Sequence, residues 1–220
     1  MAGLEGELLQ AGLSRGKRNV FVQIPTAAGQ ESEESLARWR KLGEEQAVRL
    51  GTESVYIPLH TREDAFRPDL VEAINDAALI YFSGGDPHHL ALSLHNTPAW
   101  KAIEKSWLTG SSLGGCSAGA MVFGEEIISI RKSRAMAGLK LLPRVQVIPH
   151  YDKFLGWLPD RIAAAVLSAK AETILLGIDE KTALVRDNDE SGWRVWGEKK
   201  VHVLKGLPVK SYSAGESIRL

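Results

Sequence analysis

The chain has 220 residues, of which 44% are hydrophobic and 25% are charged, a composition typical of a folded globular protein rather than a disordered one. Its 27 basic and 27 acidic residues give a formal net charge of zero, so no basic excess points to nucleic acid or to an anionic membrane surface as a partner. The single cysteine, Cys116, excludes an intrachain disulfide and a cysteine-based zinc site. Because no apolar run has the length of a signal peptide or a membrane span, we expect a cytoplasmic protein.

The predicted elements alternate between strands and helices. Residues 1–17 mix leucines with glycines, and we expect a loop or short helix that leads into the fold. Short apolar runs that end at turn residues predict strands, and apolar residues three or four positions apart predict helices. The expected strands are residues 19–25, 55–59, 78–82, 144–149, 173–178 and 182–185. The expected helices are residues 31–51, a short one through Leu70 and Ile74, residues 87–107 with a break near 96–98, and residues 159–170.

The C-terminal part predicts antiparallel structure. Residues 193–196 and 201–204 alternate between apolar and polar side chains, and the four residues between them suggest the turn of a hairpin. Earlier, Arg131, Lys132 and Arg134 predict an exposed loop in a stretch without clear periodicity.

Together these elements imply an α/β fold: a mostly parallel sheet with helices on both faces, closed by a C-terminal antiparallel hairpin. We expect one domain over residues 1–220, with 1–17 as a lead-in segment and 191–220 as the hairpin tail.

The segment Gly115-Cys116-Ser117-Ala118-Gly119 has the pattern G-x-S-x-G of a nucleophile elbow. In such an elbow the serine lies on a tight strand-to-helix turn, so its neighbours two positions away must have almost no side chain. Both are glycine here. The pattern predicts that the Ser117 hydroxyl is presented as a nucleophile.

Several polar positions follow directly after predicted strands: Thr26, Ser83-Gly84-Gly85, Ser117, His150 and Glu180. In open α/β sheets the ligand crevice lies at the carboxyl ends of the strands. The sequence therefore predicts an active site at that edge of the sheet.

A serine nucleophile needs a general base, and six histidines are candidates. His88, His89 and His95 fall in predicted helix and His202 in the predicted hairpin, whereas His60 ends the second strand and remains an alternative. His150 follows an apolar strand and a proline, which favours it as the base.

The imidazole in turn needs a carboxylate to fix its orientation. Glu180 and Asp179 follow a strand, and Asp152 lies two residues after His150, so these three remain open as alternatives. Glu125 and Glu126 are better explained as solvated charges. The backbone N–H of Ala118, together with the loop at Gly84 and Gly85, would supply the donors for an oxyanion.

Four motifs occur in one order: residues 82–87 (FSGGDP), 115–121 (GCSAGAM), 148–152 (IPHYD) and 177–183 (GIDEKTA). With these motifs the chain resembles the peptidase E and cyanophycinase family of serine peptidases, and the resemblance covers roughly residues 18–205. The family's fold is similar to the class I glutamine amidotransferases and is flavodoxin-like. The resemblance implies a Ser–His–Glu arrangement with Ser117 as nucleophile, His150 as general acid and base, and Glu180 as its orienting partner. It also implies that Gly84 and Gly85 bind the oxyanion together with Ala118.

The resemblance is weaker for substrate choice. Family members that cleave after an N-terminal aspartate have a three-glycine loop, where this chain has Ser83-Gly84-Gly85. They also have an arginine at the position of Ala164, and Arg161 is the nearest substitute here. Cyanophycinases have Asp-Gln-His-Phe where this chain has Ile148-Pro149-His150-Tyr151. We therefore expect a dipeptidase acting on small peptides, without strict specificity for Asp-X bonds.

Two other functions are compatible with the sequence: a binding module that keeps the site without turnover, and a glutaminase-type enzyme that uses Cys116 as nucleophile. No cofactor motif or metal-ligand spacing is present, so no cofactor and no metal are expected. A homodimer is one option for the oligomeric state.

Overall fold

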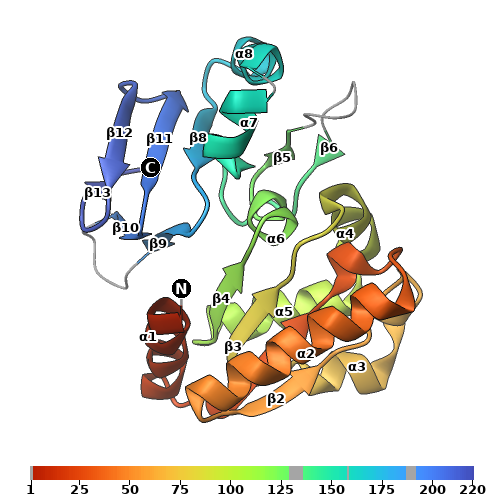
Figure 1. Cartoon of the computed structure of the whole chain (residues 1–220). Coiled ribbons are helices and arrows are strands. Elements are labelled where there is room, and N and C mark those ends of the chain that lie inside the picture. Colours follow the sequence, from red (N-terminus) through yellow and green to blue (C-terminus); the bar gives the residue numbers. More distant parts are fainter. Residues whose placement is uncertain (1, 129–135, 158, 187–191) are drawn as a thin grey trace. The chain divides into compact units, whose positions relative to one another are not determined.

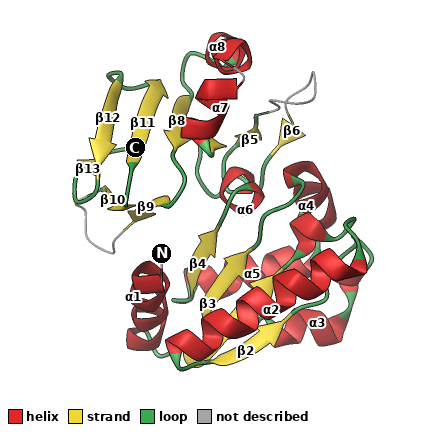
Figure 2. Ribbon diagram, in the orientation of Figure 1, coloured by secondary structure: helices red, strands yellow, loops and turns green. Residues whose placement is uncertain are grey.

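The structure is a computed structural model that describes residues 2–128, 136–157, 159–186 and 192–220. It divides into two compact units, Ala2–Ala120 and Met121–Leu220, and each contains its own sheet (Figure 1; Figure 2). The exposed loop predicted from Arg131, Lys132 and Arg134 lies outside the described residues. The single domain expected from the length stays a prediction.

The first unit is built on a four-stranded parallel sheet with the order β2-β1-β3-β4. Its strands are β1 (Arg18–Ile24), β2 (Glu53–Tyr56), β3 (Ala77–Phe82) and β4 (Ser112–Gly115). In the register of the last pair, Phe82 lies opposite Gly115. This pairing brings the loop after β3 beside the turn after β4, at the carboxyl edge of the sheet.

One helix precedes these strands and others connect them, as parallel pairing requires. They are α1 (Ala2–Ser14), α2 (Glu33–Leu50), α3 (Pro68–Ala73), α4 (Pro87–Leu94) and α5 (Pro98–Leu108), with 3-10 turns at Thr26–Ala28 and Asp64–Phe66; α6 (Ala118–Val122) follows β4. Helix α2 begins at Ser32, whose side chain accepts a hydrogen bond from the backbone of Ser35, and ends at Gly51 with φ +64°. Prolines begin α3, α4 and α5, where a missing N–H has no cost.

The sheet of the first unit has helices on both faces (Figure 1). On one face, Leu9 of α1 and Ala47 of α2 pack with Phe21 and Leu79 of the strands. Successive strand residues point to opposite faces, so Val22 and Ile80 face the other layer, where α3 and α5 lie. The α/β fold with a mostly parallel sheet and helices on both faces is thereby confirmed.

Most of the expected lead-in segment forms α1, a thirteen-residue helix packed on β3 and β4. Leu4 and Leu9 are buried. A Cβ atom added at Gly12 would lie 2.1 Å from the carbonyl oxygen of Ala78. The glycine that lowers helix propensity is thus the residue that lets the helix approach the strand.

The second unit contains a four-stranded mixed sheet with the order β12-β11-β8-β7, of which β7 and β8 are parallel. These strands are β7 (Val145–Pro149), β8 (Ile174–Ile178), β11 (Lys200–Lys205) and β12 (Lys210–Ser213). Helices α7 (Tyr151–Trp157) and α8 (Pro159–Ser168) contribute Tyr151 and Ile162 to a core with Ile148 and Leu175. A three-stranded antiparallel sheet holds β9 (Thr182–Arg186), β10 (Trp193–Gly197) and β13 (Ser217–Ile218), and β5 (Glu126–Ile127) pairs with β6 (Met136–Ala137).

The C-terminal strands are antiparallel, as predicted, but their partners differ from the prediction. Strand β10 pairs with β9 and β13, whereas β11 pairs with β8 and β12. The predicted pairing of residues 193–196 with residues 201–204 is therefore wrong. The chain passes from one sheet to the other at Gly197, with φ +123°, and the hairpin of the tail is formed by β11 and β12.

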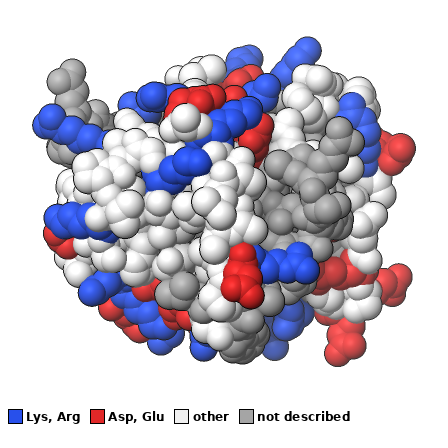
Figure 3. All heavy atoms as spheres, turned by 90° about the horizontal axis from the view of Figure 1, so that it is seen from above, with Lys and Arg blue, Asp and Glu red and all other residues white. Residues whose placement is uncertain are grey.

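Two smaller differences concern element boundaries. Strand β2 covers Glu53–Tyr56, earlier than the predicted 55–59, and His60 consequently lies in the following loop. Helix α7 was not predicted, and it begins directly after His150. Among the residues that the structure describes, no helix has both the length and the apolar character needed to cross a membrane. Basic and acidic side chains are intermixed on the face drawn in Figure 3.

Candidate active site

Ser117 lies on a tight turn between β4 and α6 in the first unit. Its φ is +51°, in the left-handed region that a non-glycine residue rarely adopts. A Cβ atom at Gly115 would lie 2.7 Å from the backbone of Gly119, and one at Gly119 would lie 2.5 Å from the carbonyl oxygen of Phe82. Neither position has room for a side chain, which is the steric requirement that the G-x-S-x-G pattern predicted.

The loop after β3 lies beside this serine. A Cβ atom at Gly84 would be 3.5 Å from the Ser117 Cβ atom and 3.4 Å from the ring of Trp39. Gly85 has φ +140°, and a Cβ atom there would lie 2.2 Å from the carbonyl oxygen of Ala27. The loop therefore approaches the serine with backbone rather than side chains.

Asp86 fixes the exit of this loop. Its carboxylate accepts hydrogen bonds from the backbone N–H groups of His88 (2.7 Å) and His89 (3.2 Å), and so caps α4. Its own N–H donates to the carbonyl oxygen of Ala27 at 2.7 Å. The loop is thus held at both Gly85 and Asp86 against the 3-10 turn after β1.

Cys116 lies beside the serine in the sequence. Burial raises the pKa of Cys116, and this effect outweighs hydrogen bonds with the Tyr81 side chain and the Gly84 backbone, which lower it. A thiol is a poor nucleophile compared with a thiolate. A raised pKa disfavours the thiolate that a glutaminase-type enzyme would need at Cys116.

In the second unit, His150 occupies a turn of the same kind. It follows β7, it has φ +51°, and α7 begins at the next residue. Its Nδ1 atom lies 3.5 Å from Oε1 of Glu180, and Nζ of Lys153 lies 3.9 Å from Oε2 of the same carboxylate. The imidazole and the carboxylate are each about two fifths exposed (42% and 41%). At 3.5 Å the contact is longer than an ordinary hydrogen bond.

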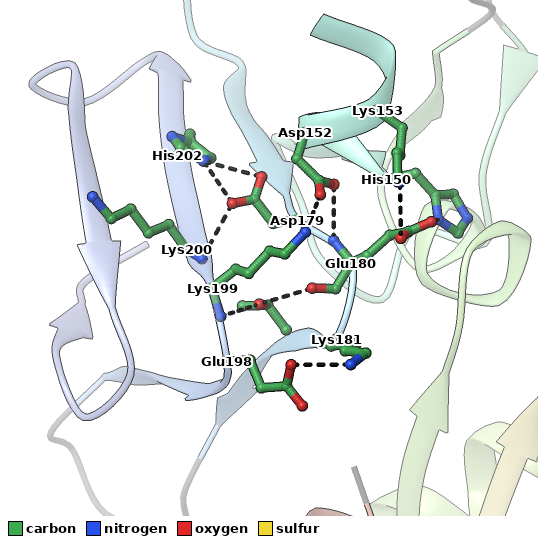
Figure 4. Close-up of polar contacts among 11 residues, drawn as sticks. His150, Asp152, Lys153, Asp179, Glu180, Lys181, Glu198, Lys199, Lys200 and His202 are labelled. Atoms are coloured by element: carbon green, nitrogen blue, oxygen red, sulfur yellow. Dashed lines mark hydrogen bonds and ion pairs between the residues drawn. The ribbon is translucent and has the colours of Figure 1, made fainter. Parts of the chain in front are cut away.

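The two other carboxylates that were open as alternatives have different partners (Figure 4). Asp179 contacts Nε2 of His202 at 3.1 Å and accepts a hydrogen bond from the backbone of Lys200 at 3.3 Å. Asp152 accepts hydrogen bonds from the backbone N–H of Glu180, at 3.0 Å, and from Nζ of Lys199. Of the three carboxylates, Glu180 is therefore the one that contacts His150. Asp152 and Asp179 instead form hydrogen bonds with the backbone of Glu180 and of Lys200.

The remaining candidates are distributed over both units. Arg161 lies on the exposed side of α8 in the second unit. His60 lies in the loop after β2, where its Nε2 atom is 2.9 Å from the hydroxyl of Tyr56 and burial lowers its pKa. Ser117 and Ala118 belong to the first unit, and His150 with Glu180 belongs to the second, so each part has its own local geometry.

Sequence reasoning missed two residues near Glu180. Lys153 contacts its carboxylate, and His202 contacts its neighbour Asp179. Lys153 could have been found from its spacing of three residues after His150 on a helix, had α7 been predicted. For His202 the local sequence carries no such signal, because its partner is 23 residues away across the sheet.

Comparison with known proteins gives consistent results. The model of peptidase family S51 matches residues 5–192. Cyanophycinases from Synechococcus elongatus and Geminocystis herdmanii are 30% and 33% identical to the chain, over 65% and 56% of its length. These alignments cover 46% and 47% of the two relatives, so the chain spans about half the length of the curated relatives it matches.

Two solved structures are also similar. A peptidase from an acI-B1 actinobacterium shares 49% identity and a TM-score of 0.94, over 100% of this chain and 91% of the other. A putative peptidase E protein from Listeria monocytogenes, 18% identical, has a TM-score of 0.62 over 83% of this chain and 88% of the other, and supports the fold. The fold and the matches are those of a class of peptidases. The chain belongs to peptidase family S51, and the resemblance to peptidase E and cyanophycinase is confirmed.

Proposed function

We propose that this protein hydrolyses small peptides as a serine peptidase, through an acyl-enzyme formed on Ser117. The observation that carries the proposal is the turn at Ser117, where two glycine positions without room for a side chain hold a serine at φ +51°. Such strained positions tend to cluster at functional sites. Membership of peptidase family S51 supports the same chemistry.

In the proposed reaction, the Ser117 oxygen attacks the carbonyl carbon of the scissile bond while His150 accepts the hydroxyl proton. The tetrahedral intermediate collapses, the C–N bond breaks, and His150 returns the proton to the leaving amine. Water then attacks the ester in the same way and releases Ser117. Glu180 lies 3.5 Å from Nδ1 of His150, so Nε2 is the ring nitrogen that exchanges the proton with the serine.

The developing oxyanion would be bound by backbone N–H groups of Ala118 and of the loop at Gly84 and Gly85. The position of Gly84 beside Ser117 supports this assignment. Arg161, which is exposed on α8, is the proposed contact for a charged group of the substrate.

Small peptides are the proposed substrates, because the similar proteins are named as a peptidase, a putative peptidase E protein and cyanophycinases. Strict preference for Asp-X is not part of the proposal, since the loop reads Ser83-Gly84-Gly85 and Ala164 replaces the expected arginine. A cytoplasmic location and a homodimer are further expectations, and light scattering of the purified protein tests the latter.

The test combines a substrate panel with active-site labelling. Dipeptides and N-blocked peptides are incubated with the wild type and with Ser117→Ala, and a fluorophosphonate probe is followed by mass spectrometry. We expect turnover and labelling in the wild type, and loss of both in Ser117→Ala. His150→Ala should slow labelling by orders of magnitude without unfolding the protein.

Two outcomes would contradict the proposal. Labelling that persists in Ser117→Ala would exclude this serine as the nucleophile. A wild type that binds peptides but neither turns them over nor reacts with the probe would favour the binding module instead.

A further inference from the structure

His202 is the centre of a polar network (Figure 4). It is not one of the proposed catalytic residues. Its Nε2 atom lies 3.1 and 3.2 Å from the two carboxylate oxygens of Asp179. Its Nδ1 atom lies 2.8 Å from the hydroxyl of Ser211, the residue opposite it on β12. Both ring nitrogens therefore have partners, and the ring orientation is fixed.

Asp179 and Glu180 are consecutive residues at the end of β8, and their side chains point in opposite directions (Figure 4). The Glu180 side chain points to His150, while Asp179 points to β11. The Asp179 side chain is only 9% exposed. A buried carboxylate is strongly destabilised when its hydrogen-bonding partner is removed. His202 therefore holds the backbone from which Glu180 projects.

His202 also contacts the segment that carries His150. Its ring centroid lies 4.8 Å from that of Tyr151, the residue that follows His150. The Tyr151 ring also packs against Gly177, the residue opposite His202 on β8, where a Cβ atom would lie 2.5 Å from the ring. One side chain on β11 thus contacts the neighbours of both members of the His150–Glu180 pair.

The other charged groups around this network come from α7, from β11 and from the turn before β11. Asp152 accepts hydrogen bonds from the backbone N–H of Glu180 and from Nζ of Lys199, and the N–H of Lys200 donates to Asp179. None of these contacts reaches both neighbours of the pair in the way that His202 does.

We propose that His202 is a positioning residue that aligns Glu180 with His150 by holding Asp179 and Tyr151. The inference rests on the proposed function for its effect on catalysis, but its structural part does not. Glu180 aligned with Nδ1 favours the His150 tautomer that carries its proton on Nδ1. Without His202, that preference should weaken and the imidazole should lose its catalytic orientation.

The first measurement is independent of turnover. Ring ¹⁵N chemical shifts give the tautomer of His150 in the full chain, at a pH well above the ordinary imidazole pKa of about 6.5. We expect the Nδ1–H tautomer to dominate in the wild type and a mixture of tautomers in His202→Ala. His202→Gln, whose amide N–H can reach Asp179, should restore the wild-type tautomer.

The second measurement separates kcat from KM. We expect kcat to fall about 10–100-fold in His202→Ala with KM little changed, as for other residues that orient a catalytic group, and to recover in His202→Gln. His202→Phe keeps a ring against Tyr151 but removes the contact with Asp179, so it replaces His202→Ala if that variant does not fold, with the same result expected. His95→Ala, at an exposed histidine in the other unit, should change neither measurement.

The proposal is overturned if a folded His202→Ala or His202→Phe protein retains both the wild-type tautomer and the wild-type kcat. The same holds if His202→Gln fails to restore either of them. If no peptide is turned over at all, the proposed function fails, but the tautomer of His150 still decides the role of His202.

Discussion

Ser117 and His150 have the same unusual backbone conformation: each has φ +51° and lies in a turn between a parallel strand and a helix. A left-handed conformation at a non-glycine residue costs about 1–3 kcal/mol. Seven described non-glycine residues have positive φ, and these two are the ones in strand-to-helix turns. The residues proposed as nucleophile and base thus lie on the same type of strand-to-helix turn, one in each unit.

Gly119 should tolerate no side chain, because a Cβ atom there would lie 2.5 Å from the carbonyl oxygen of Phe82. We expect Gly119→Ala to lower the free energy of unfolding by about 1–3 kcal/mol, the usual cost of overpacking. Gly156→Ala is the matched control, since that glycine is also helical and a Cβ atom there meets nothing within 4 Å. The control should be neutral or stabilise by about 0.5–1 kcal/mol in urea unfolding. Equal effects of the two substitutions would contradict the steric argument.

Gly84 and Gly85 should respond differently to the same substitution. At Gly84 a methyl group makes ordinary contacts with Trp39 and Ser117, so Gly84→Ala should keep the wild-type Tm. The methyl would displace a substrate from the serine, and we expect kcat/KM to fall about 100-fold. Gly85→Ala, with φ +140° and a Cβ atom 2.2 Å from Ala27, should instead lower Tm. A Gly84→Ala protein with full activity would argue against this loop as part of the oxyanion site.

Cys116 should be dispensable for catalysis. Because burial raises the pKa of its thiol, we expect iodoacetamide to react slowly at neutral pH. Cys116→Ala should retain most of the peptidase activity and lose about 1 kcal/mol of stability, as is usual for a single substitution. Rapid inactivation by iodoacetamide that Cys116→Ala escapes would instead support a cysteine nucleophile.

Asp152 should contribute stability that depends on pH. Burial alone would raise the pKa of Asp152, but hydrogen bonds from Lys199 and the backbone of Glu180 outweigh it and lower the pKa below its usual value. A lowered folded-state pKa means that the contribution is present above the unfolded pKa of about 3.9 and is lost as pH falls through the folded value.

We therefore expect Asp152→Asn to lower Tm by about 2–4 °C at pH 7. The difference from the wild type should stay constant down to about pH 5 and shrink below about pH 4. Glu53→Gln, at an exposed carboxylate in the first unit, should show no comparable change. A difference between wild type and Asp152→Asn that grows towards low pH would contradict the assignment.

The elements with strong local signals were predictable from the sequence. Helix α2 has Ser32 before it and Gly51 after it, and each forms the expected cap. The G-x-S-x-G pattern predicted the turn at Ser117 because its steric demand is local and falls on two glycines. The fold class followed from the alternation of such elements.

The features that were missed depend on partners far away in the sequence. Gly12 weakens the helical pattern of α1, and its reason, close packing on Ala78, belongs to the tertiary structure. Alternation in β10 and β11 shows that they are strands but not which strands they pair with. The different partners of Asp152, Asp179 and Glu180 have the same origin, since Lys199 and His202, which contact the first two, are distant in the sequence.

Helix α1 shields Phe21 and Leu79 of the parallel sheet from water through buried residues such as Leu9. Proteolysis between Ser14 and Arg18 would remove α1 and expose a contiguous hydrophobic surface on the sheet. Such surfaces commonly cause self-association. Samples clipped there should precipitate or form soluble aggregates even though every proposed catalytic residue is intact, so N-terminal integrity is the first property to verify in any preparation with low activity.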